Sequence, residues 1–331
     1  MALRSCAFNK KQAVFILAAG ILVLFFVELL SFAFFTVFKE RFTFYDIDRF
    51  LMTDTVIDYA QQGYHAQRGW DNHYKTPFGE RPRAVDYKDP YIVSFGDSFV
   101  HCDQVKDNET WQEYLSSTLK RDVYNFGTGG YATDQAYLKF LEKYPKVRTP
   151  VVILGLTTEN INRIVNVYRP FYFEKTGQRI TKPRFEIVND RLTLRKNPIT
   201  SENEIGKLKD PRFIHEIGRR DYWYNRDKRP VLKFPYTKIL FNRRLWRELA
   251  NKTDDIAPRP WANLWEDQEA RELMFRIIDS FVADVHAAGG NSRRHGHPRS
   301  PPNSVQIPKG EGFGQHLEDH GLLPAKELHL L

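Results

Sequence analysis

The strongest pattern in the chain is a long apolar stretch near its start, at residues 13–38, in which Glu28 is the one ionisable residue. A helix needs about 20 apolar residues to cross the hydrocarbon core of a membrane. The Leu, Ile, Phe and Val side chains outweigh a central charge that costs about 3 kcal/mol. Glu28 is then protonated, paired with another helix, or displaced toward an interface. We expect one transmembrane helix at 13–38.

The residues that flank this stretch predict its orientation. Arg4, Lys10 and Lys11 precede it without an acid among them, whereas residues 39–41 carry both signs of charge. This favours a cytoplasmic amino terminus (1–12) and an extracytoplasmic remainder. The apolar stretch is too long for a typical signal-peptide core and lacks a small-residue cleavage site, so we expect an uncleaved, single-pass signal anchor.

Beyond the anchor, short apolar runs alternate with segments of helical periodicity. Runs rich in β-formers occur at 91–95, 123–126 and 151–154, and apolar residues at helical spacing occur at 110–119 and 133–144. Strands that alternate with helices predict an α/β fold, a three-layer α/β/α parallel sheet. Residues 39–90 show no clean periodicity, and we expect an ordered lead-in segment that packs on this domain.

The region after the third run is less regular. Residues 170–235 contain hairpin-like pieces, with a turn expected at Asn189 and Asp190. We interpret this region as an insertion, either a substrate wall over the carboxyl edge of the sheet or a plain surface elaboration. Residues 236–250 and 262–288 are expected to be helical, which brings the domain to 91–290.

The last segment, 291–331, does not fit the fold. After a helix and the glycines at 289 and 290, a parallel sheet calls for another buried strand, but residues 291–302 are rich in Arg, His and Pro. One codon choice for this region, read one nucleotide later, encodes Ala-Ile-Pro-Val-Val-Met-Val-Ile. We therefore hypothesise that 291–331 are the non-native product of a frameshift; the alternative is a disordered terminus.

The composition of the chain limits the classes of partner and cofactor that we expect. The formal charge is +8, but Lys and Arg are mixed with Asp and Glu along the chain, so we expect a solvated surface and no nucleic-acid partner. The two cysteines, Cys6 and Cys102, lie on opposite sides of the apolar stretch, and no intrachain disulfide is expected. No Cys or His cluster has metal-ligand spacing, so neither a metal nor another cofactor is expected. The oligomeric state is left open.

Three strand ends carry candidate chemistry. The first run ends in Gly-Asp-Ser at 96–98, the second leads into Asn-Phe-Gly-Thr-Gly-Gly at 125–130, and the third into Gly-Leu-Thr-Thr-Glu-Asn at 155–160. Parallel α/β sheets gather their chemistry at the carboxyl ends of the strands. A serine there is a nucleophile if a base and an oxyanion hole converge on it.

The order of these three blocks resembles the SGNH (GDSL-type) hydrolase family over about residues 91–165. The resemblance implies that Ser98 is the nucleophile and that its N–H, the N–H of Gly130 and the amide of Asn160 bind the oxyanion. The third block departs from the family's Gly-x-Asn-Asp and places Glu159 in the asparagine slot. An ionised glutamate cannot donate a hydrogen bond, so Asn160 is preferred, with Asn162 in reserve.

Other residues receive secondary roles. Asp97 braces the turn, and His101 lines the pocket or, alternatively, acts as a base. Thr158 and Arg163 are further candidates for substrate binding. The family carries its base late, as Asp-x-x-His, but no histidine of this chain has an aspartate three positions before it. We therefore expect weak or no turnover.

Together these features predict a membrane-anchored extracytoplasmic serine esterase. Its expected substrates are ester-linked acyl groups, such as those of O-acylated cell-surface glycans. The alternatives are a glycan O-acyltransferase and a non-catalytic envelope protein that keeps the fold as a binding module.

Overall fold

The computed structural model describes residues 9–42, 44–227, 229–243, 245–246, 250, 264–290 and 328–330. The chain divides into two compact units, Met1–Arg49 with Arg226–Arg259 and Phe50–Asn225 with Pro260–Leu331. The expected lead-in (39–90) is thus divided between the units, and so is the expected insertion (170–235).

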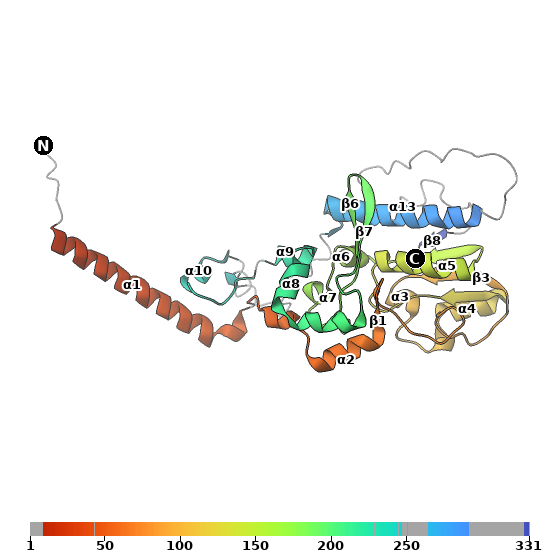
Figure 1. The fold of residues 1–331 in the computed structure, drawn as a ribbon, viewed down its shortest axis with the longest axis horizontal. Coiled ribbons are helices and arrows are strands. Elements are labelled where there is room, and N and C mark those ends of the chain that lie inside the picture. Colours follow the sequence, from red (N-terminus) through yellow and green to blue (C-terminus); the bar gives the residue numbers. More distant parts are fainter. Residues whose placement is uncertain are drawn as a thin grey trace. The chain divides into compact units, whose positions relative to one another are not determined.

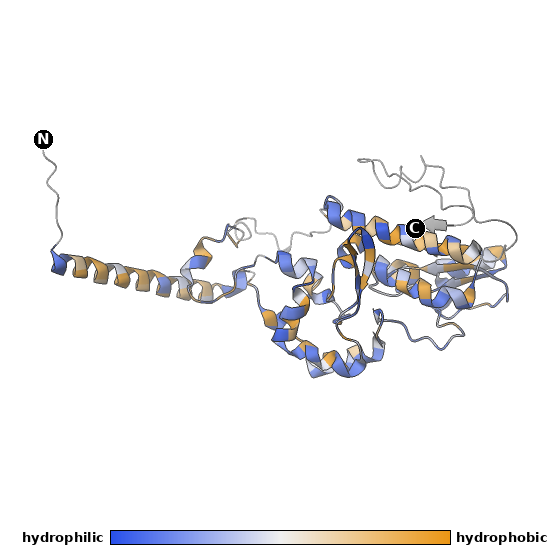
Figure 2. Cartoon of the chain, turned by 45° about the horizontal axis from the view of Figure 1, so that its top comes forward, coloured by the Kyte–Doolittle hydropathy of each residue, from blue (hydrophilic) through white to orange (hydrophobic). Residues whose placement is uncertain are grey.

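The first unit is built on α1 (Lys10–Val37), which is apolar along its length (Figure 2) and long enough to cross a membrane. Two side chains cap its amino terminus. The side chain of Asn9 accepts a hydrogen bond from the N–H of Lys11 (3.4 Å), and the side chain of Gln12 accepts one from the N–H of Asn9 (3.2 Å). A short 3₁₀ turn, η1 (Lys39–Arg41), follows the helix. In the second segment of this unit, the helix expected at 236–250 is interrupted: α10 (Thr237–Leu240) ends before Phe241 and Asn242.

The second unit contains a parallel sheet, which confirms the mixed α/β class. Its strands β3 (Pro90–Phe95), β4 (Asp122–Asn125), β5 (Val151–Leu154) and β8 (Leu328–Leu330) lie in the order β4-β3-β5-β8. In register, Val93 lies beside Tyr124 on one side and Val152 on the other. The three predicted strands are therefore neighbours, and their carboxyl ends meet at one edge.

Helices cover both faces of this sheet (Figure 1). Side chains alternate along a strand, so Val93 and Phe95 point to one face, where α5 (Thr133–Val147) and α13 (Gln268–Gly290) pack. Ile92 points to the other face, which is covered by α4 (Trp111–Leu119). The helices predicted at 110–119 and 133–144 are thus present, the first capped by Thr110.

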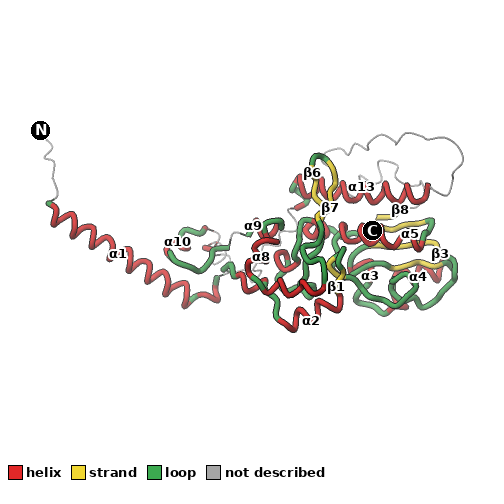
Figure 3. The backbone as a smooth tube through the Cα atoms, in the orientation of Figure 1, coloured by secondary structure: helices red, strands yellow, loops and turns green. Residues whose placement is uncertain are grey.

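The remaining elements are short. Before β3 come η2 (Ile47–Phe50), α2 (Asp54–Gly63), β1 (Tyr64–His65), β2 (Gly69–Trp70) and a long irregular connection (green in Figure 3). After it come α3 (Ser98–His101), η3 (Asp107–Glu109), α6 (Asn160–Ile164), α7 (Arg169–Tyr172), η4 (Glu202–Lys209), α8 (Pro211–Gly218) and α9 (Tyr222–Arg226).

The predicted hairpin is formed by β6 (Arg184–Val188) and β7 (Arg191–Arg195). Its turn lies at Asn189 and Asp190, which both adopt positive φ angles, 50° and 59°. The hairpin packs on the same face as α5 and α13, where the ring of Phe185 stacks on Tyr137 of α5.

Most of the terminal segment, 291–327 and 331, lies outside the described residues. The exception is β8, which pairs in parallel with β5 and occupies the sheet position beyond it. The position expected for a further strand is therefore occupied by a strand, and the frameshift remains a hypothesis.

Candidate active site at the carboxyl ends of three strands

The first strand end places Ser98 at the start of a helix. After β3, Asp97 caps α3 by accepting a hydrogen bond from the N–H of Phe99 (3.0 Å). A Cβ on Gly96 would lie 2.6 Å from the carbonyl oxygen of Gly155, so only glycine fits where β3 and β5 end. Ser98 is half-buried, and neither its hydroxyl nor its N–H donates to an acceptor in the described part of the chain.

The second strand end packs directly on α3. Asn125 donates to the carbonyl oxygen of His101 (3.3 Å) and accepts from the N–H of Gly127 (2.9 Å). A Cβ on Gly127 would lie 2.2 Å from the backbone nitrogen of His101. The glycine-rich loop thus lies against the helix that begins with Ser98.

Gly130 adopts a left-handed conformation, with φ at 76°. A side chain is disfavoured at such an angle. Its N–H, like that of Ser98, has no acceptor among the residues that the structure describes. The loop therefore presents a free backbone donor at the position that the sequence assigned to the oxyanion hole.

The third strand end reaches the first through Asp97. Asn160 donates one amide hydrogen to Asp97 Oδ2 (2.9 Å) and the other to the hydroxyl of Thr157 (2.9 Å). Thr157 in turn donates to the same carboxylate oxygen (3.0 Å). Asn160 thus lies at the site, but its amide braces the residue before Ser98, and both of its hydrogens are engaged.

The other two predicted residues of this block differ in position. Arg163 donates to the carbonyl oxygen of Tyr131 (2.8 Å) and lies 3.6 Å from Asp97 Oδ2, so it joins the second and third strand ends. Thr158 is exposed, and its carbonyl oxygen accepts from the indole of Trp265 (2.9 Å). The reserve residue Asn162 is fully buried, and its side-chain amide has no hydrogen-bond partner within the described residues.

His101 is held by both ring nitrogens. Nδ1 bonds Asp103, and Nε2 lies 2.8 Å from the hydroxyl of Tyr74, whose ring is nearly parallel to the imidazole. No ring nitrogen is left for the hydroxyl of Ser98 in this arrangement. His101 therefore does not contact Ser98 as a base in this arrangement, and its expected role in lining the pocket stays a prediction.

The sequence did not indicate two polar side chains beside Gly130. Arg169 donates to the carbonyl oxygen of Gly130 (2.5 Å) and to the hydroxyl of Thr176 (2.9 Å). Burial, and then the charge of Arg163, lowers the pKa of Arg169 to about 10. A Cβ on Gly130 would lie 3.5 Å from the amide oxygen of Gln178. Neither residue lies in a recognisable motif, and only the folded chain brings them to the loop.

A cleft of about 440 Å³ opens beside the loop. Its lining residues include Trp70, Tyr74, Asp103, Gly129 and Gln178. Residues from the lead-in, the turn after α3, the glycine-rich loop and the insertion thus share one concave surface. A cleft of this size accommodates a small ligand.

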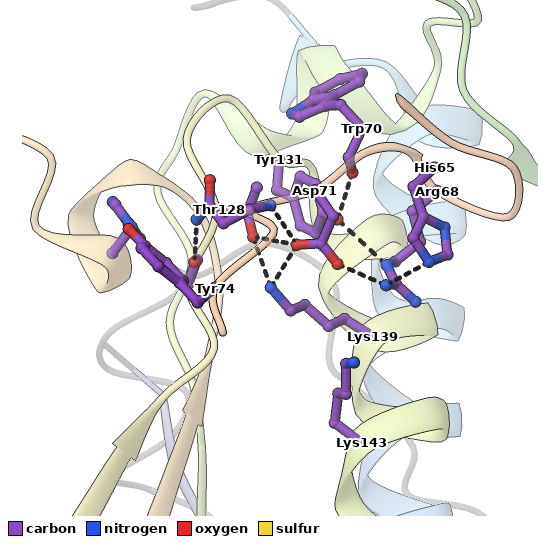
Figure 4. A network of polar contacts seen from close by, with 12 residues as sticks. His65, Arg68, Trp70, Asp71, Tyr74, Thr128, Tyr131, Lys139 and Lys143 are labelled. Carbon is purple, nitrogen blue, oxygen red and sulfur yellow. Dashed lines mark hydrogen bonds and ion pairs between the residues drawn. The ribbon is translucent and has the colours of Figure 1, made fainter. Parts of the chain in front are cut away.

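A buried ion network holds the other side of the loop (Figure 4). Asp71 lies 2.5 Å from Arg68 and 2.6 Å from Lys139, and it accepts from the hydroxyl of Thr128 (3.2 Å). Burial opposes ionisation of Asp71, but Lys139 and Arg68 together hold its pKa well below the ordinary value. The indole of Trp70 donates to the carbonyl oxygen of Gly129 (2.9 Å). The lead-in therefore fixes the loop by charge and by direct hydrogen bonds.

Two titratable groups complete this network. Nε2 of His65 lies 2.8 Å from Arg68, and burial and the charge of Arg68 lower the pKa of the imidazole to about 4. Glu142 also bonds Arg68. Burial opposes its ionisation, but Arg68 and Lys143 lower its pKa to about 2.

Comparison with known proteins found no family model that matches the chain and no significant match among curated proteins.

Proposed function

We propose that the protein is a membrane-anchored serine esterase of the SGNH (GDSL) type that acts on ester-linked acyl groups, with O-acylated cell-surface glycans as the substrate class. In this proposal α1 is the single-pass anchor, the amino terminus is cytoplasmic, and the second unit is extracytoplasmic. Helices on both faces of the sheet fit the three-layer arrangement of the family.

One observation carries the proposal: three separate strand ends meet around Ser98. Asn125 ties the glycine-rich loop to α3, and Asn160 ties the third block to Asp97. The order Ser, Gly, Asn in the sequence therefore corresponds to a shared location. Chance matches to short motifs would not require this.

In the proposed reaction, the hydroxyl oxygen of Ser98 attacks the ester carbonyl and the alcohol leaves. The free N–H groups of Ser98 and Gly130 would stabilise the oxyanion, and loss of one such donor typically lowers the rate by about 10²–10³. Water then hydrolyses the acyl-serine. Because both ring nitrogens of His101 are engaged, the proton of Ser98 passes through solvent to the alkoxide oxygen that leaves, so that the alcohol departs neutral; a proton of the attacking water returns to Ser98. Slow turnover follows from this arrangement.

Labelling of the full-length protein with a fluorophosphonate probe tests the nucleophile without assuming a substrate. Wild type should be labelled, and Ser98→Ala should not. Ser117→Ala, which removes an exposed hydroxyl from α4, is the matched control and should be labelled like wild type. Equal labelling of wild type and Ser98→Ala would refute the proposal.

A second candidate is a non-catalytic envelope protein that uses the cleft as a binding site. It is favoured by the engaged amide of Asn160 and the engaged ring of His101. Binding of an O-acylated glycan that is equal in wild type and Ser98→Ala, together with no probe labelling of either, would support it. If labelling does depend on Ser98, acyl transfer to an added sugar would distinguish the acyltransferase from the esterase.

A further inference from the structure

The apolar helix α1 has a polar partner from a distant part of the chain. The carboxylate of Glu28 accepts hydrogen bonds from the N–H of Tyr236, the N–H of Thr237 (3.0 Å) and the hydroxyl of Thr237 (2.7 Å). Of the three states expected for Glu28, the structure shows the paired one. Its partner is the amino-terminal end of α10.

Apolar contacts continue this pairing along the helix. The rings of Phe32 and Tyr236 lie 4.9 Å apart, and Phe35 is fully buried in a cluster with Ile239 and Leu245. At 1.5 Å per residue, Glu28 lies roughly 14 Å before the end of α1 at Val37. The described residues 230–243 and 245–246 therefore follow the last third of an apolar helix.

The hydrogen bonds explain how this pairing tolerates an apolar solvent. Lipid offers no partner to the free N–H groups at the start of a helix, nor to a carboxylate. Glu28 and the start of α10 satisfy each other, so each removes the obstacle to burying the other. At an aqueous surface, water would compete for both the carboxylate of Glu28 and the N–H groups at the start of α10.

The outer side of the segment combines apolar and cationic groups. Phe234 is 72% exposed and Phe241 is 82% exposed. Between residues 226 and 244 the sequence holds seven Lys and Arg against one acid, Asp227. Aromatic side chains beside cations are typical of segments that lie in the membrane interface and contact anionic headgroups.

We propose that residues 230–246 form a second membrane contact, a segment that lies in the outer interface of the bilayer that α1 spans. Phe234 and Phe241 enter the acyl-chain region, and Lys233, Lys238 and Arg243 contact anionic headgroups. This proposal depends on α1 as a membrane anchor but on no catalytic activity.

Environment-sensitive labelling of the full chain in vesicles tests this proposal. In a background with Cys6→Ser and Cys102→Ser, a nitrobenzoxadiazole label is attached at Phe241→Cys. Tyr114→Cys, on the exposed face of α4, is the control, since Tyr114 is 66% exposed. We expect quenching by doxyl-labelled lipid to be several-fold stronger at 241 than at 114, and quenching by aqueous iodide several-fold weaker.

Two results would overturn the proposal. Equal quenching by iodide at both positions would place Phe241 in water. Shielding of position 241 from iodide without quenching by doxyl lipid would show that a second protein copy, and not lipid, covers it.

Variants separate the two parts of the contact. Glu28→Leu removes the acceptor and should restore iodide quenching at 241, whereas Glu28→Gln keeps one acceptor oxygen and should do so less. Replacing Lys233, Lys238 and Arg243 by Gln should abolish any increase in doxyl quenching caused by adding phosphatidylglycerol to phosphatidylcholine vesicles. No change at 241 in Glu28→Leu would contradict the role of Glu28, and an unchanged phosphatidylglycerol effect would contradict headgroup binding.

Discussion

The two sides of the glycine-rich loop differ in how their polar groups are satisfied. On the network side, Asp71 is buried and bonds Arg68, Lys139 and Thr128. On the Ser98 side, the N–H groups of Ser98 and Gly130 are free among the described residues. Unbonded donors are useful only if they stay in place, and a rigid frame supplies that constraint. The difference suggests that the lead-in serves the site by fixing the loop.

The largest expected effect comes from removing the charge of Asp71, which lies at the centre of the network. Asp71→Asn leaves Lys139 as a buried cation without a carboxylate and leaves Arg68 with Glu142 alone, and the loss of one partner from such a cluster costs about 3–5 kcal/mol. We expect the free energy of unfolding, measured by urea titration in detergent, to fall by this amount.

The matched control for Asp71→Asn is Asp86→Asn. Asp86 pairs with Arg83 at 3.4 Å and its side chain is 59% exposed. An exposed pair contributes at most about 1 kcal/mol. Similar small losses in both variants would show that the network does not hold the second unit together.

Substitution of Asn160 tests whether the third block stabilises the folded chain or donates a hydrogen bond to the oxyanion. If its amide braces Asp97, Asn160→Ala leaves a buried carboxylate short of a donor and lowers the free energy of unfolding by about 1–3 kcal/mol. A donor used only for the oxyanion would lower the labelling rate and leave stability unchanged. Thr158→Ala, at an exposed position of the same block, should change neither quantity.

Gly130→Ala places a side chain where the backbone has a φ of 76° and where Cβ would lie 3.2 Å from Arg169 Nη1. A left-handed angle costs a residue with a side chain about 1–2 kcal/mol. The shifted N–H should also lower fluorophosphonate labelling by roughly 10². Gly177→Ala is the control, because no heavy atom lies within 4 Å of its added Cβ. Unchanged labelling of Gly130→Ala would contradict the proposed role of Gly130 as an oxyanion donor.

The sequence was informative where local pattern decides structure. Alternating apolar runs located the three parallel strands, and Asn189 and Asp190 located the hairpin turn. The carboxyl ends of parallel strands lie at one edge of a sheet, so a common edge for Ser98, Gly130 and Asn160 was predictable. The order β4-β3-β5, in which the consecutive strands β4 and β5 are not neighbours, was not.

Long-range side-chain pairing was not predictable in this way. The lead-in shows no clean periodicity because its residues bond partners more than fifty positions away in the sequence, as Asp71 bonds Lys139. Glu28 accepts hydrogen bonds from Tyr236 and Thr237, some 200 residues later in the sequence. Arg169 and Gln178 reach Gly130 only through the fold. A single sequence shows that such charges exist, but it does not show which ones meet.

The smallest expected effect comes from pH and concerns the edge of the network. Burial and then the charge of Arg68 hold the pKa of His65 in the folded chain at about 4, below its ordinary value of 6.5. Between these pH values the unfolded chain binds more protons than the folded one. The contribution of His65 to the free energy of unfolding should therefore fall as pH drops from about 6.5 toward about 4, and be constant above 6.5.

Because His65 is partly exposed, we expect this loss to be on the order of 1 kcal/mol after screening by solvent. Glu142, with its pKa lowered to about 2 from 4.5, contributes stability that is lost only as pH falls below 4.5. Asp221 also titrates in the interval from 4.5 to 6.5, because burial raises its pKa to about 6, and its contribution has the opposite sign. Since Asp221 is present in both proteins, the difference in slope between wild type and His65→Gln reports His65, and in urea titrations across this interval wild type should lose more stability than His65→Gln as pH falls. An identical slope in both proteins would mean that His65 does not contribute to the stability of the network, and that Asp71 and Lys139 hold the loop without it.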